Sequence, residues 1–281
     1  MTAEQIIING ATKTFGIVGN PVHHSLSPTM HNAAFAALGL NCVYIPLPVS
    51  DLQQGVEGLK TLGFRGVSVT IPHKENILQY VDVVDPVAAR IGAVNTLVIG
   101  NKEDAPDSSV YGYNTDWVGA NRALREKIEL KGTRVLVLGA GGSARAIGYG
   151  LLEAGAKIML SNRTVVKGQD LTRQLGCDFR PLDELGNVEA DVLINTTSVG
   201  MAPGEDRSPV DQKLLSKFSV VMDIVYAPLV TRLLREAASS GCEVIDGLSM
   251  LLYQGVAQFE LWTGRNAPVE VMQNVLRERI K

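Results

Sequence analysis

The chain has 281 residues, of which 46% are hydrophobic and 20% are charged, with 28 glycines. This composition is that of a globular protein, and the length suggests about two domains. The formal net charge of −3 excludes a polycationic field for nucleic acid or an anionic membrane, and lysine and arginine never form a run.

The cysteines and the N-terminal segment indicate the cellular compartment in which the protein is expected. Cys42, Cys177 and Cys242 lie far apart and never form a Cys-x-x-Cys pair, so we expect reduced thiols rather than a disulfide framework or a zinc site. The segment MTAEQIIINGATKTFG lacks the pattern of a secretory signal, and no apolar run reaches the roughly 18 residues of a membrane span. These features predict a soluble cytoplasmic protein with neither a nucleic-acid nor a membrane partner.

The first half of the chain alternates short apolar runs with helical patterns. A helix is predicted to begin at Ser27-Pro28, with Ser27 as its N-cap and Pro28 at the first helical position. Residues 101–114 are polar and indicate a hairpin or a loop at their start, and a helix is predicted over 115–128. Strands separated by helices favour parallel pairing and an α/β fold. The predicted strands are 15–19, 42–49, 66–72 and 96–100.

A second alternation of strands and helices begins at residue 134, and no internal repeat or low-complexity tract interrupts it. From Leu248 the tail is predicted to be helical, in two pieces that separate near TGRNAP. The predicted strands are 134–138, 157–161, 191–195, 219–224 and 243–247. The predicted helices are 143–154, 165–175 and 229–240.

The segment VLVLGAGGSARA combines a strand, a glycine turn and the start of a helix. Its spacing, Gly139-x-Gly141-x-x-Ala144, matches the dinucleotide-binding fingerprint with alanine as the third small residue. Gly139 permits the tight turn, Gly141 lets the backbone approach a pyrophosphate, and the helix start offers unpaired N–H groups to the anion. A ligand-free turn is the alternative, but the flanking strands favour a nucleotide site.

The end of the next strand indicates which nucleotide is bound. NAD sites usually carry an acid about 20 residues on, which holds the ribose 2′-hydroxyl, but here Ser161, Asn162 and Arg163 follow. Arg163 can pair with a 2′-phosphate and stack on adenine. Thr164 is a predicted N-cap that places Lys167 near the third helical position, where a cation opposes the helix dipole unless an anion binds above it. These residues favour NADP, with plain solvation of both cations as the alternative.

Four polar clusters in the first half follow strands or begin helices: HHSLSP (23–28), TIPHKE (70–75), GAVNT (92–96) and YNTDW (113–117). Ligands of open α/β sheets bind beyond the carboxyl ends of strands, and these side chains suit a polyhydroxylated, anionic small molecule. Asn95 and Asn114 are also compatible with turns.

Two further observations concern the chemistry of these clusters. Lys74 and Asp116 are the more specific candidates for catalysis, because a nearby carboxylate would position a lysine for acid–base catalysis. A metal site is not expected, since His23, His24, His31 and His73 are not grouped with cysteines or carboxylates.

Nine segments carry a wider resemblance: GNPVHHSLSPTMHNAAF, SVTIPHKE, GAVNTL, YNTD, GAGGSARA, SNRT, INTTSVGM, DIVYAPLVTRLL and GLSMLLYQGVAQFELWTG. In this order they resemble the shikimate dehydrogenase family almost from end to end. The resemblance implies NADPH-dependent reversible reduction of 3-dehydroshikimate to shikimate, by hydride transfer to the C3 carbonyl with Lys74 and Asp116 as the acid–base pair. It places this reaction in aromatic amino-acid biosynthesis.

The resemblance also implies the architecture and the partners. A substrate-binding catalytic domain with a mainly parallel sheet is expected from 1–116 together with 248–281, to which the C-terminal helices return. An NADP-binding Rossmann domain is expected from 117–247. The expected ligands are NADP(H) and shikimate or 3-dehydroshikimate, and the sequence leaves the oligomeric state open, a homodimer included.

Site residues follow from the resemblance position by position. Ser25 and Ser27 match the hydroxyls that hold the substrate carboxylate. Thr70, Asn95 and Gln254 match residues that bind the ring hydroxyls, and Tyr226 matches one that faces the substrate. The residues matched to the cofactor are Gly139, Ala140, Gly141, Gly142, Ser143, Ala144, Asn162, Arg163, Thr164, Lys167, Thr196, Ser198, Met201, Ile224, Gly247 and Met250.

Two residues depart from the family pattern, Ser68 where many members have asparagine and Trp117 where glycine is frequent. Three alternatives remain: a quinate or aminobenzoate-type dehydrogenase of the same architecture, an NADPH-binding sensor, and a scaffold protein. The presence of both Lys74 and Asp116 weighs against the sensor. Arg163 weighs against an NAD-dependent relative. The glycine turn and Arg163 together weigh against a scaffold protein, which would not need a nucleotide site.

Overall fold

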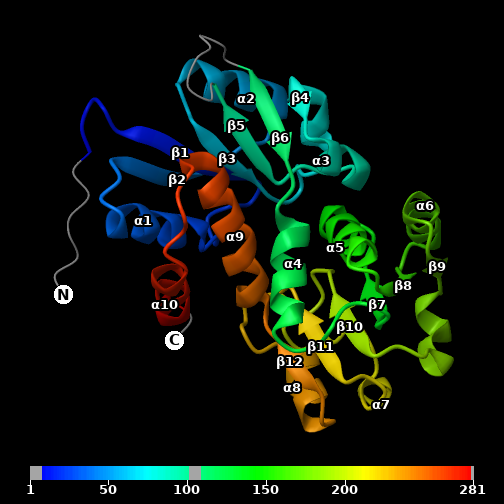
Figure 1. The fold of residues 1–281 in the computed structure, drawn as a ribbon. Helices are drawn as coiled ribbons and strands as arrows, with labels where there is room; N and C mark the ends of the chain where they lie inside the picture. Colours follow the sequence, from blue (N-terminus) through cyan, green and yellow to red (C-terminus); the bar gives the residue numbers. More distant parts are fainter. Residues whose placement is uncertain (1–7, 101–108, 280–281) are drawn as a thin grey trace. The chain divides into compact units, whose positions relative to one another are not determined.

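The computed structural model describes residues 8–100 and 109–279 (Figure 1). The chain forms two compact units, which divide the sequence between Thr115 and Asp116 and again between Gln254 and Gly255. The first unit comprises the described residues up to Thr115 and from Gly255 onward, and the second unit comprises Asp116–Gln254. The second boundary differs from the expected 247–248, because it falls within helix α9 (Gly247–Thr263), which contributes one half to each unit.

The first unit contains a six-stranded sheet with the strand order β2-β1-β3-β5-β6-β4. Four of its strands follow the predictions closely, and the sheet is mainly parallel, but β5 runs antiparallel to both of its neighbours. The strands are β1 (Lys13–Gly19), β2 (Cys42–Pro48), β3 (Gly66–Val69), β4 (Val83–Val84), β5 (Thr96–Ile99) and β6 (Val110–Tyr113).

Strand β6 lies in the segment for which a hairpin or a loop was predicted, and its antiparallel pairing with β5 agrees with the hairpin alternative, although no strand was predicted over its residues. VYGY alternates buried and half-buried positions and pairs with β5 along its whole length. The polar residues before it dominated the pattern, and 101–108 lie outside the described residues.

The helices of the first unit surround this sheet. They are α1 (Ser27–Ala37), α2 (Leu52–Thr61), α3 (Pro86–Ile91), the 3-10 turn Asn76–Tyr80, the second half of α9, and α10 (Val269–Arg279). The predicted cap of α1 is wrong by one residue: Leu26 is the N-cap and Ser27 begins the helix. Leucine cannot cap through its side chain, and Ser25 Oγ accepts a hydrogen bond from Ser27 N at 3.3 Å instead.

A buried histidine stands at the centre of an aromatic cluster in this unit. His31 has no exposed surface, and its ring stacks on Tyr44 at 4.6 Å between centroids. Trp262 lies at 5.2 Å, and Phe35 and Phe259 at 6.4 and 6.5 Å. The cluster joins α1 and β2 to the second half of α9.

The second unit contains a six-stranded sheet in the order β12-β11-β10-β7-β8-β9, with every pair parallel. This is the doubly wound order, with the reversal between β7 and β10. The strands are β7 (Arg134–Leu138), β8 (Lys157–Ser161), β9 (Asp178–Phe179), β10 (Val192–Asn195), β11 (Val220–Asp223) and β12 (Glu243–Ile245). All five predicted strands are present, and β9 was not predicted.

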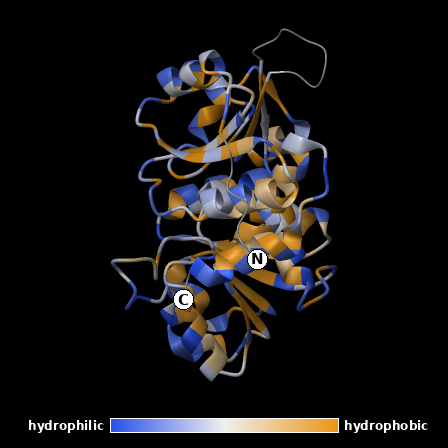
Figure 2. Ribbon diagram, turned by 90° about the vertical axis from the view of Figure 1, so that its left-hand side faces the viewer, coloured by the Kyte–Doolittle hydropathy of each residue, from blue (hydrophilic) through white to orange (hydrophobic). Residues whose placement is uncertain are grey.

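Both faces of this sheet are covered, as a parallel sheet requires. Val135 and Val137 point into one core with Ile147, whereas Leu136 and Leu138 point into the other. The middle positions of such strands are mainly apolar, and Figure 2 shows much of this sheet in orange. The helices are α4 (Asp116–Arg125), α5 (Gly142–Glu153), α6 (Val165–Leu175), the 3-10 turn Leu182–Asn187, α7 (Gln212–Leu215), α8 (Arg232–Ser239) and the first half of α9. Over the described ranges, the helices lack the length and apolarity that crossing a membrane requires.

The burial of His31 predicts how stability depends on pH. Desolvation lowers its pKa from 6.5 to about 3, partly opposed by Gln258, although neither ring nitrogen makes a hydrogen bond of normal geometry to a described residue. The unfolded chain therefore binds a proton near pH 6.5 that the folded chain does not, and stability falls as the pH decreases. Between pH 6.5 and 5 this histidine should remove about 1.6 kcal/mol from the free energy of unfolding.

His31→Phe keeps an aromatic ring in the cluster and removes the titration. Urea unfolding at both pH values should show that the variant loses about 1.6 kcal/mol less than the wild type over this interval. An identical loss in the two proteins would contradict the assignment.

Candidate functional site

Five residues expected to handle the substrate lie at one edge of the first sheet. Ser25 and Ser27 follow β1, and Thr70 and Lys74 follow β3. Asn95 directly precedes β5, and because β5 is antiparallel its beginning lies at the same edge. The topology therefore gathers hydroxyls, an amide and an ammonium group where parallel strands end.

Backbone hydrogen bonds hold the segments after β1 and β3 together. Thr70 N donates to Val18 O at 2.9 Å, and Asn20 N donates to Ile71 O at 3.0 Å. A Cβ atom on Gly19 would lie 2.5 Å from Thr70 Cγ2, so the close approach requires glycine there. Strand β3 was predicted to extend to Pro72 but ends at Val69. The proline lies beyond these bonds and does not itself end the strand.

The same kind of bonding fixes Lys74 beside Asn95. Val94 N donates to Lys74 O at 2.8 Å, and Val69 N donates to Asn95 O at 2.8 Å. The loop that carries the lysine is thus attached through its backbone to the segment that leads into β5.

Asn95 is more than a turn residue. It is 2% exposed, and its Oδ1 accepts from Thr96 Oγ1 at 2.7 Å and from Thr115 N at 2.8 Å. Its Nδ2 donates to Thr115 Oγ1 at 3.0 Å. Asn114 also makes a long-range bond rather than a local turn bond, since its Nδ2 donates to Ala93 O at 2.9 Å, 21 residues earlier in the chain.

The remaining residues matched to the substrate or to catalysis belong to the second unit. Asp116 begins α4, Tyr226 follows β11, and Gln254 lies on the first half of α9 with its Nε2 2.9 Å from Leu251 O. Burial raises the pKa of Tyr226, so its hydroxyl stays protonated at neutral pH.

The glycine turn of the second unit lies at the reversal of strand order, between the carboxyl ends of β7 and β10. Gly139 has φ +121°, and a Cβ there would lie 2.3 Å from Thr196 Oγ1. Thr196 N donates to Leu138 O at 2.9 Å, which keeps the two strand ends together. A Cβ on Gly141 would meet no described atom within 4 Å, so the space above this residue is open. The structure brings Gly139 and Thr196 into contact and leaves room for an anion at Gly141.

The residues around this turn occupy the start of α5. Gly141 is the N-cap, Gly142 and Ser143 form the first helical positions, and Ala144 is 1% exposed. Ala140 is half-buried. The amino end of a helix of this kind presents N–H groups and a positive dipole to an anion.

The end of β8 carries the cationic group of the predicted nucleotide site. Asn162 Nδ2 donates to Thr164 O at 2.9 Å and shapes the turn into α6. Thr164 is the N-cap as predicted, although its side chain makes no capping bond to a described residue. Arg163 is exposed, and so is Lys167 at the third position of α6.

Asn195 and Asp223 organise the loop that follows β10, and the sequence analysis missed both. Asn195 Oδ1 accepts from Thr197 N and Oγ1 at 3.0 and 2.7 Å, and its Nδ2 donates to Val199 O at 3.2 Å. The same Nδ2 donates to Asp223 Oδ1 at 3.0 Å. The exposed residues Ser198 and Met201 lie in this loop. Polar residues inside apolar strands were the available signal.

Asp223 is fully buried and accepts from three elements. Besides Asn195, Val225 N donates to Oδ1 at 3.0 Å and Thr231 Oγ1 donates to Oδ2 at 2.7 Å. Burial raises the pKa of Asp223 to about 6, while the three donors act in the opposite direction. Thr231 is also the N-cap of α8, so one carboxyl group links β10, β11 and α8.

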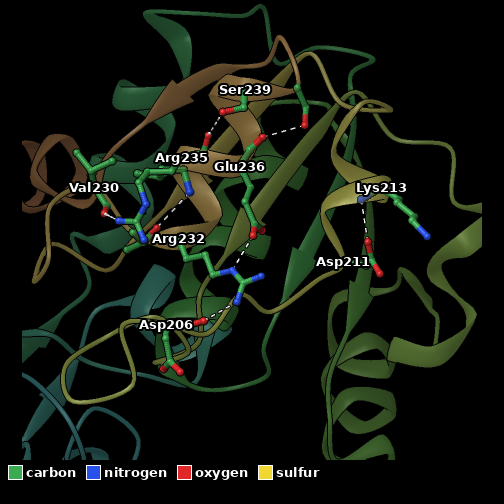
Figure 3. Close-up of polar contacts among 11 residues, drawn as sticks. Asp206, Asp211, Lys213, Val230, Arg232, Arg235, Glu236 and Ser239 are labelled. Atoms are coloured by element: carbon green, nitrogen blue, oxygen red, sulfur yellow. Dashed lines mark hydrogen bonds and ion pairs between the residues drawn. The ribbon is translucent and has the colours of Figure 1, made fainter.

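Arginine holds the far end of this loop against α8 (Figure 3). Arg232 Nη1 donates to Asp206 O at 2.7 Å, and its Nε lies 2.6 Å from Glu236 Oε1 one turn along the helix. The loop that begins at Thr196 is therefore anchored at both ends.

Three further residues matched to the cofactor lie where β11 and β12 lead into α9. Ile224 N donates to Asn195 O at 3.1 Å. A Cβ on Gly247 would lie 2.6 Å from Ile224 O, so α9 starts in direct contact with the end of β11. Met250 is 6% exposed and packs in the hydrophobic core with Met222 and Ile245.

These features define a class. Six parallel strands in the doubly wound order, with a glycine turn at the reversal point, form a dinucleotide-binding Rossmann unit. The first unit adds a sheet edge with the polar groups of a small-molecule site.

Comparison with known proteins identifies the family. The model of the shikimate dehydrogenase substrate binding domain matches residues 17–97, that of shikimate / quinate 5-dehydrogenase matches 121–221, and that of the shikimate 5′-dehydrogenase C-terminal domain matches 247–277. A shikimate dehydrogenase (NADP+) of Moorella thermoacetica is 47% identical over 97% of this chain and 95% of its own. The chain belongs to the shikimate dehydrogenase family.

Solved structures agree over the whole length. A crystal structure of a shikimate dehydrogenase in complex with NADP+ has a TM-score of 0.90 and 41% identity, and covers 98% of both chains. The enzyme of Thermus thermophilus, solved in complex with NADP(H) and shikimate, has a TM-score of 0.86 and 38% identity over 95% of this chain and 99% of its own. The α/β architecture expected from the sequence is confirmed.

Proposed function

We propose that this chain catalyses the reversible, NADPH-dependent reduction of 3-dehydroshikimate to shikimate. The carrying observation is its full-length likeness to shikimate dehydrogenases, one of which was solved with NADP(H) and shikimate. The sheet edge with Ser25, Ser27 and Asn95 offers groups that suit a carboxylated polyol. The three cysteines form no disulfide, and we place the enzyme in the reducing cytoplasm.

The residues of the second unit fit a phosphorylated dinucleotide. The open space at Gly141 and the amino end of α5 suit the pyrophosphate, and exposed Arg163 and Lys167 suit a 2′-phosphate. NADPH supplies the hydride. The anchored loop from Thr196 to Met201 is proposed to line the nicotinamide end, with Asn195 and Asp223 holding its shape.

On the substrate side, Ser25 and Ser27 at the start of α1 are proposed to bind the carboxylate, aided by the helix dipole. Thr70, Asn95, Tyr226 and Gln254 are proposed to bind the rest of the ring. As hydride adds to C3, the carbonyl oxygen gains negative charge. The Lys74 ammonium group stabilises that charge and donates a proton to the oxygen, and Asp116 orients the lysine. In the reverse direction Lys74 accepts the hydroxyl proton.

Removing the lysine tests its role in catalysis. Lys74→Ala should lower kcat by about 10²–10⁴-fold with a smaller change in KM, because the proton donor acts mainly in the transition state. Steady-state rates of shikimate oxidation would measure this. Lys213→Ala, at an exposed lysine of α7, is the matched control and should leave kcat unchanged. A near-normal kcat for Lys74→Ala would rule out the proposed role.

Removing the arginine tests the choice of cofactor. Arg163→Ala should raise KM for NADPH by about tenfold to a hundredfold, since a hydrogen bond between charged groups contributes about 1.5–3 kcal/mol. KM for NADH and kcat should change little. Arg173→Ala removes an arginine from the same region, on α6, where the side chain is 77% exposed, and serves as the control. If KM for NADPH stays unchanged in Arg163→Ala, the 2′-phosphate is held elsewhere.

A further inference from the structure

We propose that Gln258, on the second half of α9, is a positioning residue that orients Asn95 for the substrate. The sequence pattern predicted this glutamine only as part of the helical tail that begins at Leu248, and the family resemblance gave it no role. The inference rests on the proposed function, because it takes Asn95 to be a substrate contact. Gln258 is 1% exposed and lies in the first unit with all of its partners.

The orientation of the Gln258 amide is fixed by its neighbours. Its Nε2 lies 3.1 Å from Asn95 O and 2.9 Å from Thr96 Oγ1, and its Oε1 lies 2.7 Å from Ser68 Oγ. A backbone carbonyl can only accept a hydrogen bond, so Nε2 must face Asn95. The reversed amide would set two carbonyl oxygens against each other, and the alternative assignment is excluded.

Gln258 acts on Asn95 through Thr96, which adds a second donor to the Asn95 Oδ1 atom already held by the backbone N–H of Thr115. The Thr96 hydroxyl accepts from Gln258 and therefore directs its own proton to Asn95 Oδ1, 2.7 Å away. Thr115 N donates to the same oxygen at 2.8 Å. With Oδ1 bound in this way, Nδ2 is the end of Asn95 that is suited to meet a substrate hydroxyl, and it meets it as a donor.

The acceptor end of Gln258 organises a second series of hydroxyls. Ser68 donates to Oε1, and Tyr44 donates in turn to Ser68 Oγ at 2.6 Å. Burial raises the pKa of Tyr44, which keeps it protonated as this direction requires, and Ser27 also contacts its hydroxyl. One buried network, made of Ser27, Tyr44, Ser68, Gln258, Thr96 and Asn95, thus connects two residues matched to the substrate. Gln258 sets the direction in the middle of this network, because its amide presents a fixed donor to Asn95 O and Thr96 and a fixed acceptor to Ser68.

A purely structural role must be separated from positioning, and the same helix supplies the comparison. Trp262 Nε1 donates to Leu97 O at 2.9 Å, one turn further along α9 and further along the same strand. Leu97 is a buried residue of the hydrophobic core and is not among the residues matched to the substrate. Both side chains attach α9 to β5, but only Gln258 acts on Asn95.

The test compares Gln258→Met with Trp262→Phe. Methionine keeps the length of the side chain and removes its hydrogen bonds. Gln258→Met should raise KM for shikimate roughly threefold to tenfold, the worth of one hydrogen bond, and leave KM for NADP+ unchanged. Trp262→Phe should lower the melting temperature and leave both KM values unchanged. Thr96→Val removes the hydroxyl that accepts from Gln258 and donates to Asn95 Oδ1, leaves the bonds of Gln258 to Asn95 O and Ser68 in place, and should reproduce the KM effect. It serves as the test if Gln258→Met fails to fold.

A double-mutant cycle identifies the path of the effect. In an Asn95→Ala background, Gln258→Met or Thr96→Val should produce no further rise in KM for shikimate. The proposal is overturned if folded single variants keep the wild-type KM, if the effect is equally large without Asn95, or if Asn95→Ala itself has no effect. Failure of the proposed function looks different, because the wild-type chain would then not oxidise shikimate with NADP+ at all.

Discussion

The backbone carbonyl of Asn95 can accept a hydrogen bond but cannot donate one, and the direction of the buried polar network in the first unit depends on this constraint. It fixes which way the Gln258 amide points, and the amide fixes the protons of Ser68 and Thr96. The sheet edge at which β1 and β3 end and β5 begins therefore presents polar groups of defined direction. A binding site for a polyhydroxylated molecule needs this, since hydroxyls that rotate freely must be ordered when the ligand binds.

The second unit meets the same need with other means. Gly139 lets Thr196 approach so closely that no side chain fits between them, and Asn195 and Asp223 hold the loop beyond. The buried carboxyl of Asp223 is costly to ionise but binds three donors, so it holds the loop after β10 to β11 and α8. In each unit, buried hydrogen bonds thus hold in place the residues that are proposed to bind its ligand.

Local patterns predicted much of this molecule. The glycine turn, five of the six strands of the second unit and the N-cap at Thr164 follow from short-range rules, and the structure has them at or near the predicted residues. Strand β6 was missed because polar neighbours masked a short alternating segment, and the cap of α1 shifted because Ser25 acts from two residues away. Gln258 was not predictable, since its partners lie about 160 or more residues away in the chain and only the fold brings them together.

The account depends most on the identity of the two ligands. The direct measurement is the initial rate of NADPH or NADH formation by the purified protein, with shikimate and quinate each crossed against NADP+ and NAD+. The account predicts rapid turnover of shikimate with NADP+ and little in the other combinations, because the site suits the shikimate ring and Arg163 suits the 2′-phosphate. Equal efficiency with quinate or with NAD+ would contradict that specificity. A folded protein that binds NADPH and turns over neither acid would contradict the enzymatic function itself.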